Sequence, residues 1–274
     1  MLEAEIDEAK RMANKITTIT LATGVFLGCA VIKTPVVNSA PTLLGPTPYL
    51  SFNDSPFKNV SFSYFHLDNF EDGSLNVPGV TASSASGLPV SVPGPDFYRD
   101  SVDIDDGVID GNGQQGHALY EQGNGIIGGF KFNFNVNILG NLPTHVGIVW
   151  TDSYSSLGGP PETDQTPLTF QGFDAQGNSL GTIALSQGQI GDNRFDGTTV
   201  DDRFFGVINL AGISAISISQ TLIDVGFEVD HLQYGFFSQS SQPVSEPSTV
   251  FGLLGFGLFG LGVFCKRTVS ANWI

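Results

Sequence analysis

The sequence predicts an all-β protein, an antiparallel β-sandwich of jelly-roll type, on three observations. Phenylalanines at 130, 132 and 134 and Val136 alternate with polar residues, the period of two that is typical of a half-buried strand. Short runs of this kind recur with Gly, Asp and Asn between them, as strands joined by turns do. The composition agrees, because 34 Gly, 22 Phe and only 14% charged residues are typical of aromatic-rich β structure with many turns.

The strands are expected in chain order within a single β-sandwich domain at residues 41–237. The runs that predict them are 60–67, 126–136, 145–151, 168–173, 179–185, 204–208, 213–218 and 227–234. Asp174–Asn178 is a turn signal, so the two strands beside it are expected to form a hairpin. Residues 41–55 are rich in proline and are expected to be extended, and 78–100 and 153–166 are expected to be long loops. The domain shows no helical periodicity of useful length.

Both ends of the chain look like targeting segments and not like parts of the domain. Basic residues at 10, 11 and 15 precede an apolar stretch at 16–32, which is the build of a secretory signal peptide, expected at residues 1–40 with Met12 as a possible true start. At the other end a polar linker at 238–245 leads to the charge-free run 250–264. Such a run is stable as a helix in a bilayer, so a short transmembrane helix is predicted at 249–265.

The last segment, residues 246–274, resembles a PEP-CTERM sorting tail. Glu246, Pro247 and Ser248 stand where that family has its signature, and Lys266 and Arg267 close the apolar run. Ser245 replaces the first proline of the signature. The resemblance implies that the membrane holds the chain transiently through its C-terminal helix. It also implies that an exosortase-type protease then releases the body to the cell surface or extracellular matrix. The alternative is a simple membrane anchor that is never cut.

Charge and cysteine content limit the partners of the body. Its acidic residues outnumber its basic ones by about 17. An acidic surface of this kind repels phosphate backbones, so nucleic acid is not an expected partner, whereas cations and a hydrated extracellular polysaccharide are. The two cysteines, Cys29 and Cys265, lie in the two apolar end segments. A mature body without those segments would have no disulfide.

Two short motifs near the ends of the domain resemble those of carbohydrate-binding-module-like jelly rolls. One is the Phe-Glu-Asp-Gly turn at 70–73 with Asp68 just before it, and the other is the stretch 227–232 around Asp230, which resembles an apolar-x-Asp-apolar pattern. In such folds the terminal strands lie side by side, and the resemblance implies that the carboxylates of Asp68, Glu71 and Asp230 bind calcium, the one cofactor we expect. Calcium prefers six to eight oxygen ligands, so backbone carbonyls and water would complete the site. The alternative is that Glu71 is a turn residue and Asp230 points to solvent.

Two further acidic stretches are interpreted as structural. Residues 103–113 are dense in Asp and Gly but lack the spacing of an EF-hand, which favours a hydrated loop over a calcium site. Asp201 and Asp202 precede Arg203, and this order is interpreted as a local ion pair.

Ligand-binding and catalytic residues are less clearly marked. Phe97, Tyr98 and Tyr154 lie in expected loops and are the candidates for stacking on sugars, whereas Trp150 is expected in the core. The sequence has no Gly-x-Ser-x-Gly elbow and no His-Glu-x-x-His motif, so no enzyme is predicted. We therefore expect an exported, non-enzymatic surface or matrix protein. The alternatives are a calcium-stabilised carbohydrate-binding module and, third, a polysaccharide-modifying hydrolase.

Overall fold

A computed structural model describes residues 39–97, 99–122, 127–152, 168–185, 197–223 and 226–237. The predicted linker at 238–245, the sorting tail at 246–274 with its transmembrane helix at 249–265, and nearly all of the predicted signal peptide lie outside these residues. Within the described part of the chain, none of the helices is long and apolar enough to cross a membrane.

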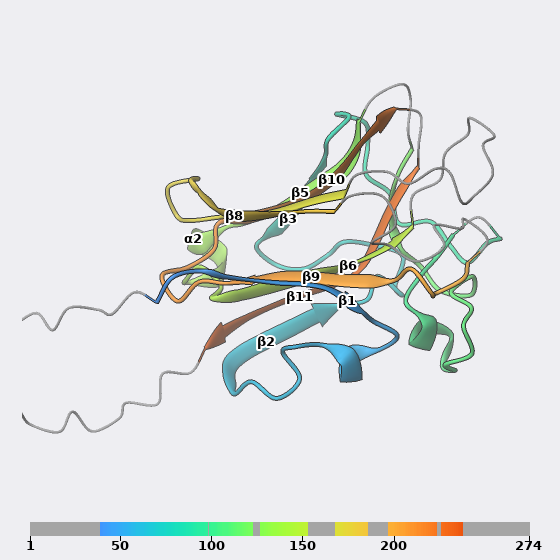
Figure 1. Cartoon of the computed structure of the whole chain (residues 1–274), viewed down its shortest axis with the longest axis horizontal. Helices are drawn as coiled ribbons and strands as arrows, with labels where there is room; N and C mark the ends of the chain where they lie inside the picture. Colours follow the sequence, from blue (N-terminus) through green and yellow to red (C-terminus); the bar gives the residue numbers. More distant parts are fainter. Residues whose placement is uncertain are drawn as a thin grey trace, which may run out of the picture. The chain divides into compact units, whose positions relative to one another are not determined.

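Two antiparallel sheets form the two layers of a β-sandwich (Figure 1). The first sheet has the order β1 (Thr42–Pro48), β9 (Arg203–Ile208), β6 (His145–Asp152), β11 (Phe227–Phe237), β2 (Phe62–Asp68), and β4 (Leu119–Glu121) also pairs with β11. The second sheet has the order β3 (Val80–Ser84), β5 (Ile127–Phe134), β10 (Ala215–Ile223), β7 (Leu168–Phe173), β8 (Ser179–Ala184). The described helices are one-turn segments: η1 (Phe52–Asp54), η2 (Asp103–Asp106) and α2 (Val136–Leu139). The prediction of an antiparallel all-β fold is confirmed.

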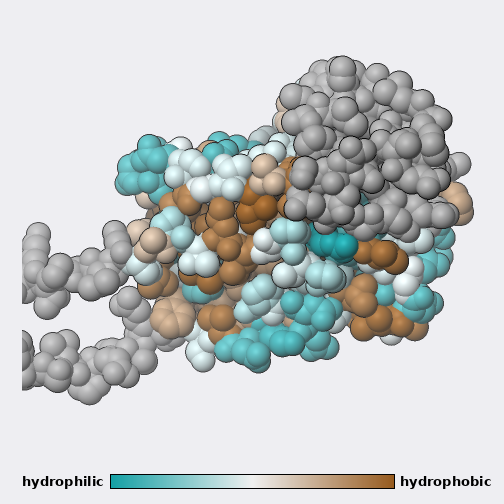
Figure 2. Space-filling view, viewed as in Figure 1, coloured by the Kyte–Doolittle hydropathy of each residue, from teal (hydrophilic) through white to brown (hydrophobic). Residues whose placement is uncertain are grey.

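Aromatic side chains from both sheets meet in the core between the layers. Phe170 of β7 stacks on Phe205 of β9 with ring centroids 5.8 Å apart, and Phe130 of β5 lies 5.9 Å from Phe227 of β11. Trp150 is 1% exposed in this core, as predicted. Apolar residues accordingly gather between the two layers in the space-filling view, whereas the outer rims are polar (Figure 2).

The first sheet is also covered on its outer face. Tyr49, Phe57, Val102, Val149 and Phe204 form a second buried cluster there, beneath the segments that flank η1 and η2. Since both faces are covered, all eight residues of β6 are buried, and its central residues 146–150 form a continuous apolar run instead of an alternating one.

Two local expectations were wrong. The strand expected at 126–136 ends at Phe134, because the Asn135 side chain accepts a hydrogen bond from the backbone of Asn137 and caps helix α2. Strand β3 lies in an expected loop, and it is a short edge strand in which only Val80 is buried. The stretch at 41–55, expected to be extended, contains strand β1, whose prolines are tolerated because it is an edge strand.

Candidate functional site

The two motifs from the ends of the domain lie side by side, as the resemblance implied. Strand β11 pairs with β2 in antiparallel register, with Leu232 opposite Asp68. The pairing of β11 with β6 shifts register between Asp230 and Gln233, and His231 in this bulge has a φ of +45°. The bulge gives Asp230 and His231 positions that a regular strand would not.

Asp230 is fully buried, so the alternative that it points to solvent is wrong. Its carboxylate accepts hydrogen bonds from the backbone N–H groups of Val102 (2.9 Å) and His231 (2.6 Å). Burial, and next the charge of Asp105, raise the pKa of Asp230 well above its ordinary value. Asp105, Asp230 and His231 each offer a ligand atom within 4.8 Å of the others.

His231 belongs to a chain of buried hydrogen bonds. Ser55 Oγ donates to Gln233 Oε1 (2.6 Å), and Gln233 Nε2 donates to the Tyr49 hydroxyl (3.0 Å). In this orientation Tyr49 donates to His231 Nδ1 (2.9 Å), and His231 donates from Nε2 to Asp105 Oδ1 (3.0 Å). Both ring nitrogens are thus occupied by protein partners. The network ties η1 and η2 to β11.

The other two predicted calcium ligands lie near this cluster but not in it. Among the described residues, the group of potential ligand atoms around Asp230 contains Asp105 and His231, not Asp68 or Glu71. Asp68 Oδ1 accepts the backbone N–H of Phe70 (3.1 Å), and Glu71 accepts the backbone N–H of His117 (2.5 Å). Burial is the main cause that raises the pKa of both carboxyls.

The fit of this region to calcium is mixed. Oδ2 of Asp68 and Oδ2 of Asp105 are buried and have no hydrogen-bond partner among the described residues, which favours a cation nearby. Against this, backbone N–H groups already occupy the Asp230 carboxylate, and His231 brings a nitrogen to a site for a hard cation. The calcium site of Asp68, Glu71 and Asp230 therefore stays a prediction.

A shallow pocket of about 390 Å³ opens beside the cluster. Asp105 and His231 line it together with residues of η1 and with Asn69. Sequence reasoning included Asp230 but did not assign a role to Asp105 or His231. The histidine next to Asp230 was the available signal, whereas nothing in the order of residues connects Asp105 to a strand 126 positions away.

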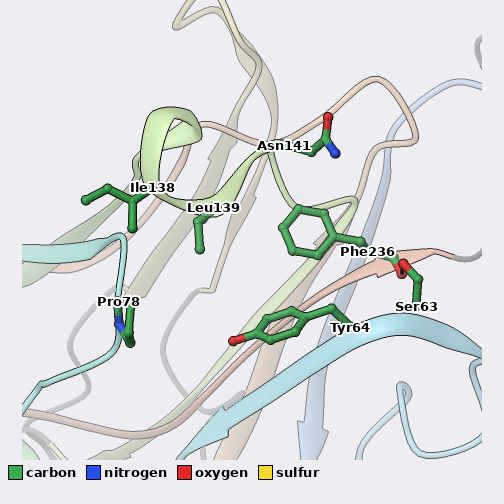
Figure 3. Close-up of a pocket in the computed structure, with 7 residues that line it drawn as sticks. All are labelled: Ser63, Tyr64, Pro78, Ile138, Leu139, Asn141 and Phe236. Carbon is green, nitrogen blue, oxygen red and sulfur yellow. Dashed lines mark hydrogen bonds between the residues drawn. The ribbon is translucent and has the colours of Figure 1, made fainter.

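A second pocket, of about 360 Å³, lies between α2 and the paired strands β2 and β11 (Figure 3). Tyr64 stands opposite Phe236 in register, and their ring centroids are 5.6 Å apart. Figure 3 shows this aromatic pair on one side of the pocket and Leu139 on the other, with Asn141 and Ser63 at the rim. Tyr64 is 44% exposed. An open pocket with one exposed and one half-buried aromatic ring and a few polar groups can take a small organic ligand such as a sugar.

Of the predicted stacking residues, only Phe97 belongs to the described part of the chain, and it lines neither pocket. Phe97 is 58% exposed, as expected of a loop aromatic. Tyr98 and Tyr154 lie outside the described residues. Tyr64 and Phe236 were missed because a strand aromatic in a single sequence is more readily assigned to the core.

The acidic loop at 103–113, interpreted from the sequence as a hydrated loop, is organised by one buried side chain. Asp103 is buried and accepts hydrogen bonds from the backbone N–H groups of Asp110, Gly111 and Asn112 and from the Thr199 hydroxyl. Its carboxylate therefore holds the loop through protein donors.

Comparison with known proteins gives one sequence match, in the tail. Residues 243–267 match the PEP-CTERM protein-sorting motif. This match covers Glu246, Pro247, Ser248, Lys266 and Arg267, so the predicted resemblance is confirmed there. No curated protein sequence matches the chain.

Solved structures similar to this chain share little sequence with it. The enzymatically active domain of the bacteriophage CBA120 tailspike protein 4 is 13% identical, with a TM-score of 0.31; the match covers 61% of this chain and 20% of the tailspike chain. TmCBM61 in complex with β-1,4-galactotriose is 14% identical, with a TM-score of 0.30; the match covers 61% of this chain and 94% of the TmCBM61 chain. The xylan-binding domain from CBM 22 is 12% identical, with a TM-score of 0.31; the match covers 65% of this chain and 96% of the xylan-binding domain.

The described domain and the C-terminal match together define a class: a β-sandwich protein with a sorting tail. The PEP-CTERM motif indicates that the chain is exported and passes through a membrane-anchored sorting intermediate.

Proposed function

We propose that this chain is a non-enzymatic β-sandwich protein of the cell surface or extracellular matrix, released from the membrane by an exosortase-type protease. The observation that carries the proposal is the sorting motif at residues 243–267. The acidic body supports it, since a strongly charged domain stays soluble in a hydrated polysaccharide matrix. The engagement of both His231 nitrogens by Tyr49 and Asp105 favours a structural role for that network over a catalytic one.

Cleavage of the tail is expected to depend on the motif. In a host with an exosortase, the intact mass of the surface or culture form should lack the apolar run at 250–264. Glu246→Ala and Pro247→Ala should leave that run in place and move most of the protein to the membrane fraction. Ser240→Ala, in the predicted linker, is the matched control and should be processed normally.

Three outcomes would contradict the proposal. A tail of full length on the wild-type chain in the exosortase host would show the alternative, an uncut anchor. Equal processing with and without the exosortase would assign the cleavage to another protease. Turnover of a polysaccharide by the purified chain would overturn the non-enzymatic assignment and favour a polysaccharide-modifying hydrolase.

A second candidate function is a calcium-stabilised carbohydrate-binding module, which the pocket beside Tyr64 and Phe236 favours. If this pocket binds a glycan, Tyr64→Ala should weaken binding at least about tenfold, or ~1.4 kcal/mol. Phe97→Ala is the matched comparison, because Phe97 is an exposed aromatic outside the pocket. A glycan array with and without chelator identifies the ligand, and titration of both variants follows. Loss of binding in Phe97→Ala alone would move the site to the predicted loop.

A further inference from the structure

Three fully buried carboxylates from distant parts of the chain converge outside the sites described so far. Asp100 lies between β3 and η2, and Asp201 and Asp202 immediately precede β9. Each is 0% exposed, and each offers an oxygen within 4.8 Å of those of the other two. We call these three residues the aspartate triad.

The oxygens of two triad members have no donor. Both carboxylate oxygens of Asp100 and both of Asp202 are buried without a hydrogen-bond partner among the described residues. A buried carboxylate is stable only when donors, a positive charge or a metal compensate for its lost hydration. Four such oxygens at one place therefore indicate a ligand that contributes positive charge.

Nearby side chains add further negative charge around the aspartate triad. Asp152 is close enough to raise the pKa of both Asp100 and Asp202, and Glu228 also raises that of Asp100. Arg99 forms its ion pair with Glu228 at 2.8 Å. The cations in the described surroundings thus do not bind the oxygens of Asp100 or Asp202.

Arg203 does not form the ion pair with Asp202 that the sequence predicted. Its guanidinium donates to the backbone carbonyls of Val200 and Asp202, both at 2.8 Å, and its charge only partly offsets the carboxylates around Asp202. The guanidinium therefore supports the turn before β9 and leaves the Asp202 carboxylate for another partner.

The backbone closes tightly around the triad. A Cβ atom added to Gly113 would lie 2.1 Å from Asp100 Oδ1 and 2.1 Å from the Ser101 carbonyl oxygen. Only glycine fits at this position, so the acidic loop packs directly against the Asp100 carboxylate. The aspartate triad therefore lies in a closed region lined by oxygen atoms and not on an open acidic surface.

We propose that the aspartate triad binds one calcium ion that joins the Asp100 segment to the start of β9. The donors are all carboxylate oxygens, which hard cations prefer; no histidine or cysteine belongs to the group, as a zinc site would require. Calcium is favoured over magnesium because it sheds its water more readily and accepts irregular oxygen cages. This site differs in every residue from the predicted site of Asp68, Glu71 and Asp230, and it does not depend on the proposed function.

The test is thermal unfolding of the full chain in mild detergent, in EDTA and in 2 mM CaCl2. At about 100 times the dissociation constant, calcium should raise the midpoint by about 5–10 °C, and MgCl2 should raise it less. Asp202→Asn should abolish the calcium shift while its midpoint in EDTA rises above that of the wild type, because one buried charge is gone. Asp110→Asn, in the exposed acidic loop, should keep the full shift.

A comparison with Asp230→Asn separates the two regions. The proposal holds if Asp230→Asn keeps the calcium shift, and it is overturned if Asp230→Asn loses the shift while Asp202→Asn retains it. It is also overturned if the wild-type midpoint does not respond to calcium. Should Asp202→Asn fail to fold, calorimetric titration of calcium-stripped wild type decides: one calcium bound per chain supports the site, and no binding overturns it.

Discussion

Replacement of Phe205 by alanine is expected to destabilise the protein by about 3–5 kcal/mol. Phe205 is 0% exposed and stacks on Phe170, so this pair joins the two sheets at the centre of the sandwich. Removal of the ring loses its apolar burial and leaves a cavity that the rigid strands cannot fill. Urea unfolding of the full chain, followed by tryptophan fluorescence, measures the change.

The matched control is Val108→Ala. Val108 is 54% exposed in the loop after η2, so its truncation should change the free energy of unfolding by less than about 0.5 kcal/mol. A cost below ~1 kcal/mol for Phe205→Ala would show that the two sheets do not pack through this pair.

The calcium-free protein is expected to become more stable as the pH falls from 8 to 5.5. Burial raises the pKa of Glu228 to about 7, and it raises the pKa of Asp100, Asp202 and Asp230 well above their ordinary values. A carboxyl whose pKa is raised in the folded state binds its proton more tightly there than in the unfolded chain. Its stabilising contribution is therefore present below the unfolded pKa and is lost as the pH rises through the folded one.

The gain in the free energy of unfolding should be large, and stability should rise throughout the range as the pH falls from 8 to 5.5. Glu228 alone should contribute about 2 kcal/mol between pH 8 and 5.5, and the buried aspartates add to it. His145 opposes the trend, because burial lowers its pKa and its neutral form is lost on acidification. Unfolding midpoints measured in EDTA between pH 8 and 5.5 give the dependence of stability on pH, and Glu228→Gln should make that dependence weaker. A midpoint that falls steadily from pH 8 to 5.5 in EDTA would contradict the prediction.

The strands of the fold were largely predictable because they depend on local pattern. Phe130, Phe132 and Phe134 are buried, and Lys131 between them is exposed, as the alternation requires. The pattern failed where tertiary context decides the conformation. Thus β3 has only the small apolar residues Val80 and Ala82 to mark it and is a strand because it pairs with β5, and β6 does not alternate because both of its faces are covered.

The sites were less predictable than the strands, because they join residues that the sequence keeps far apart. Adjacency of the two terminal motifs was expected, and β2 does pair with β11. Asp105 and Asp100, however, approach their partners from loops whose path no periodicity encodes. Asp201 and Asp202 were assigned to Arg203 because an adjacent opposite charge is the simplest partner in a sequence. In the structure the Arg203 guanidinium donates hydrogen bonds to backbone carbonyls instead.

The central position of β11 has a consequence for the order in which the protein can be made. β11 pairs with β6 on one side and with β2 and β4 on the other, yet it is the last strand in the described part of the chain. A chain that emerges from a translocation channel with its N-terminus first cannot complete this sheet until nearly all of it has crossed. Only five residues, 238–242, separate the end of β11 from the sorting motif at 243, so completion of the fold and arrival of the motif at the membrane coincide.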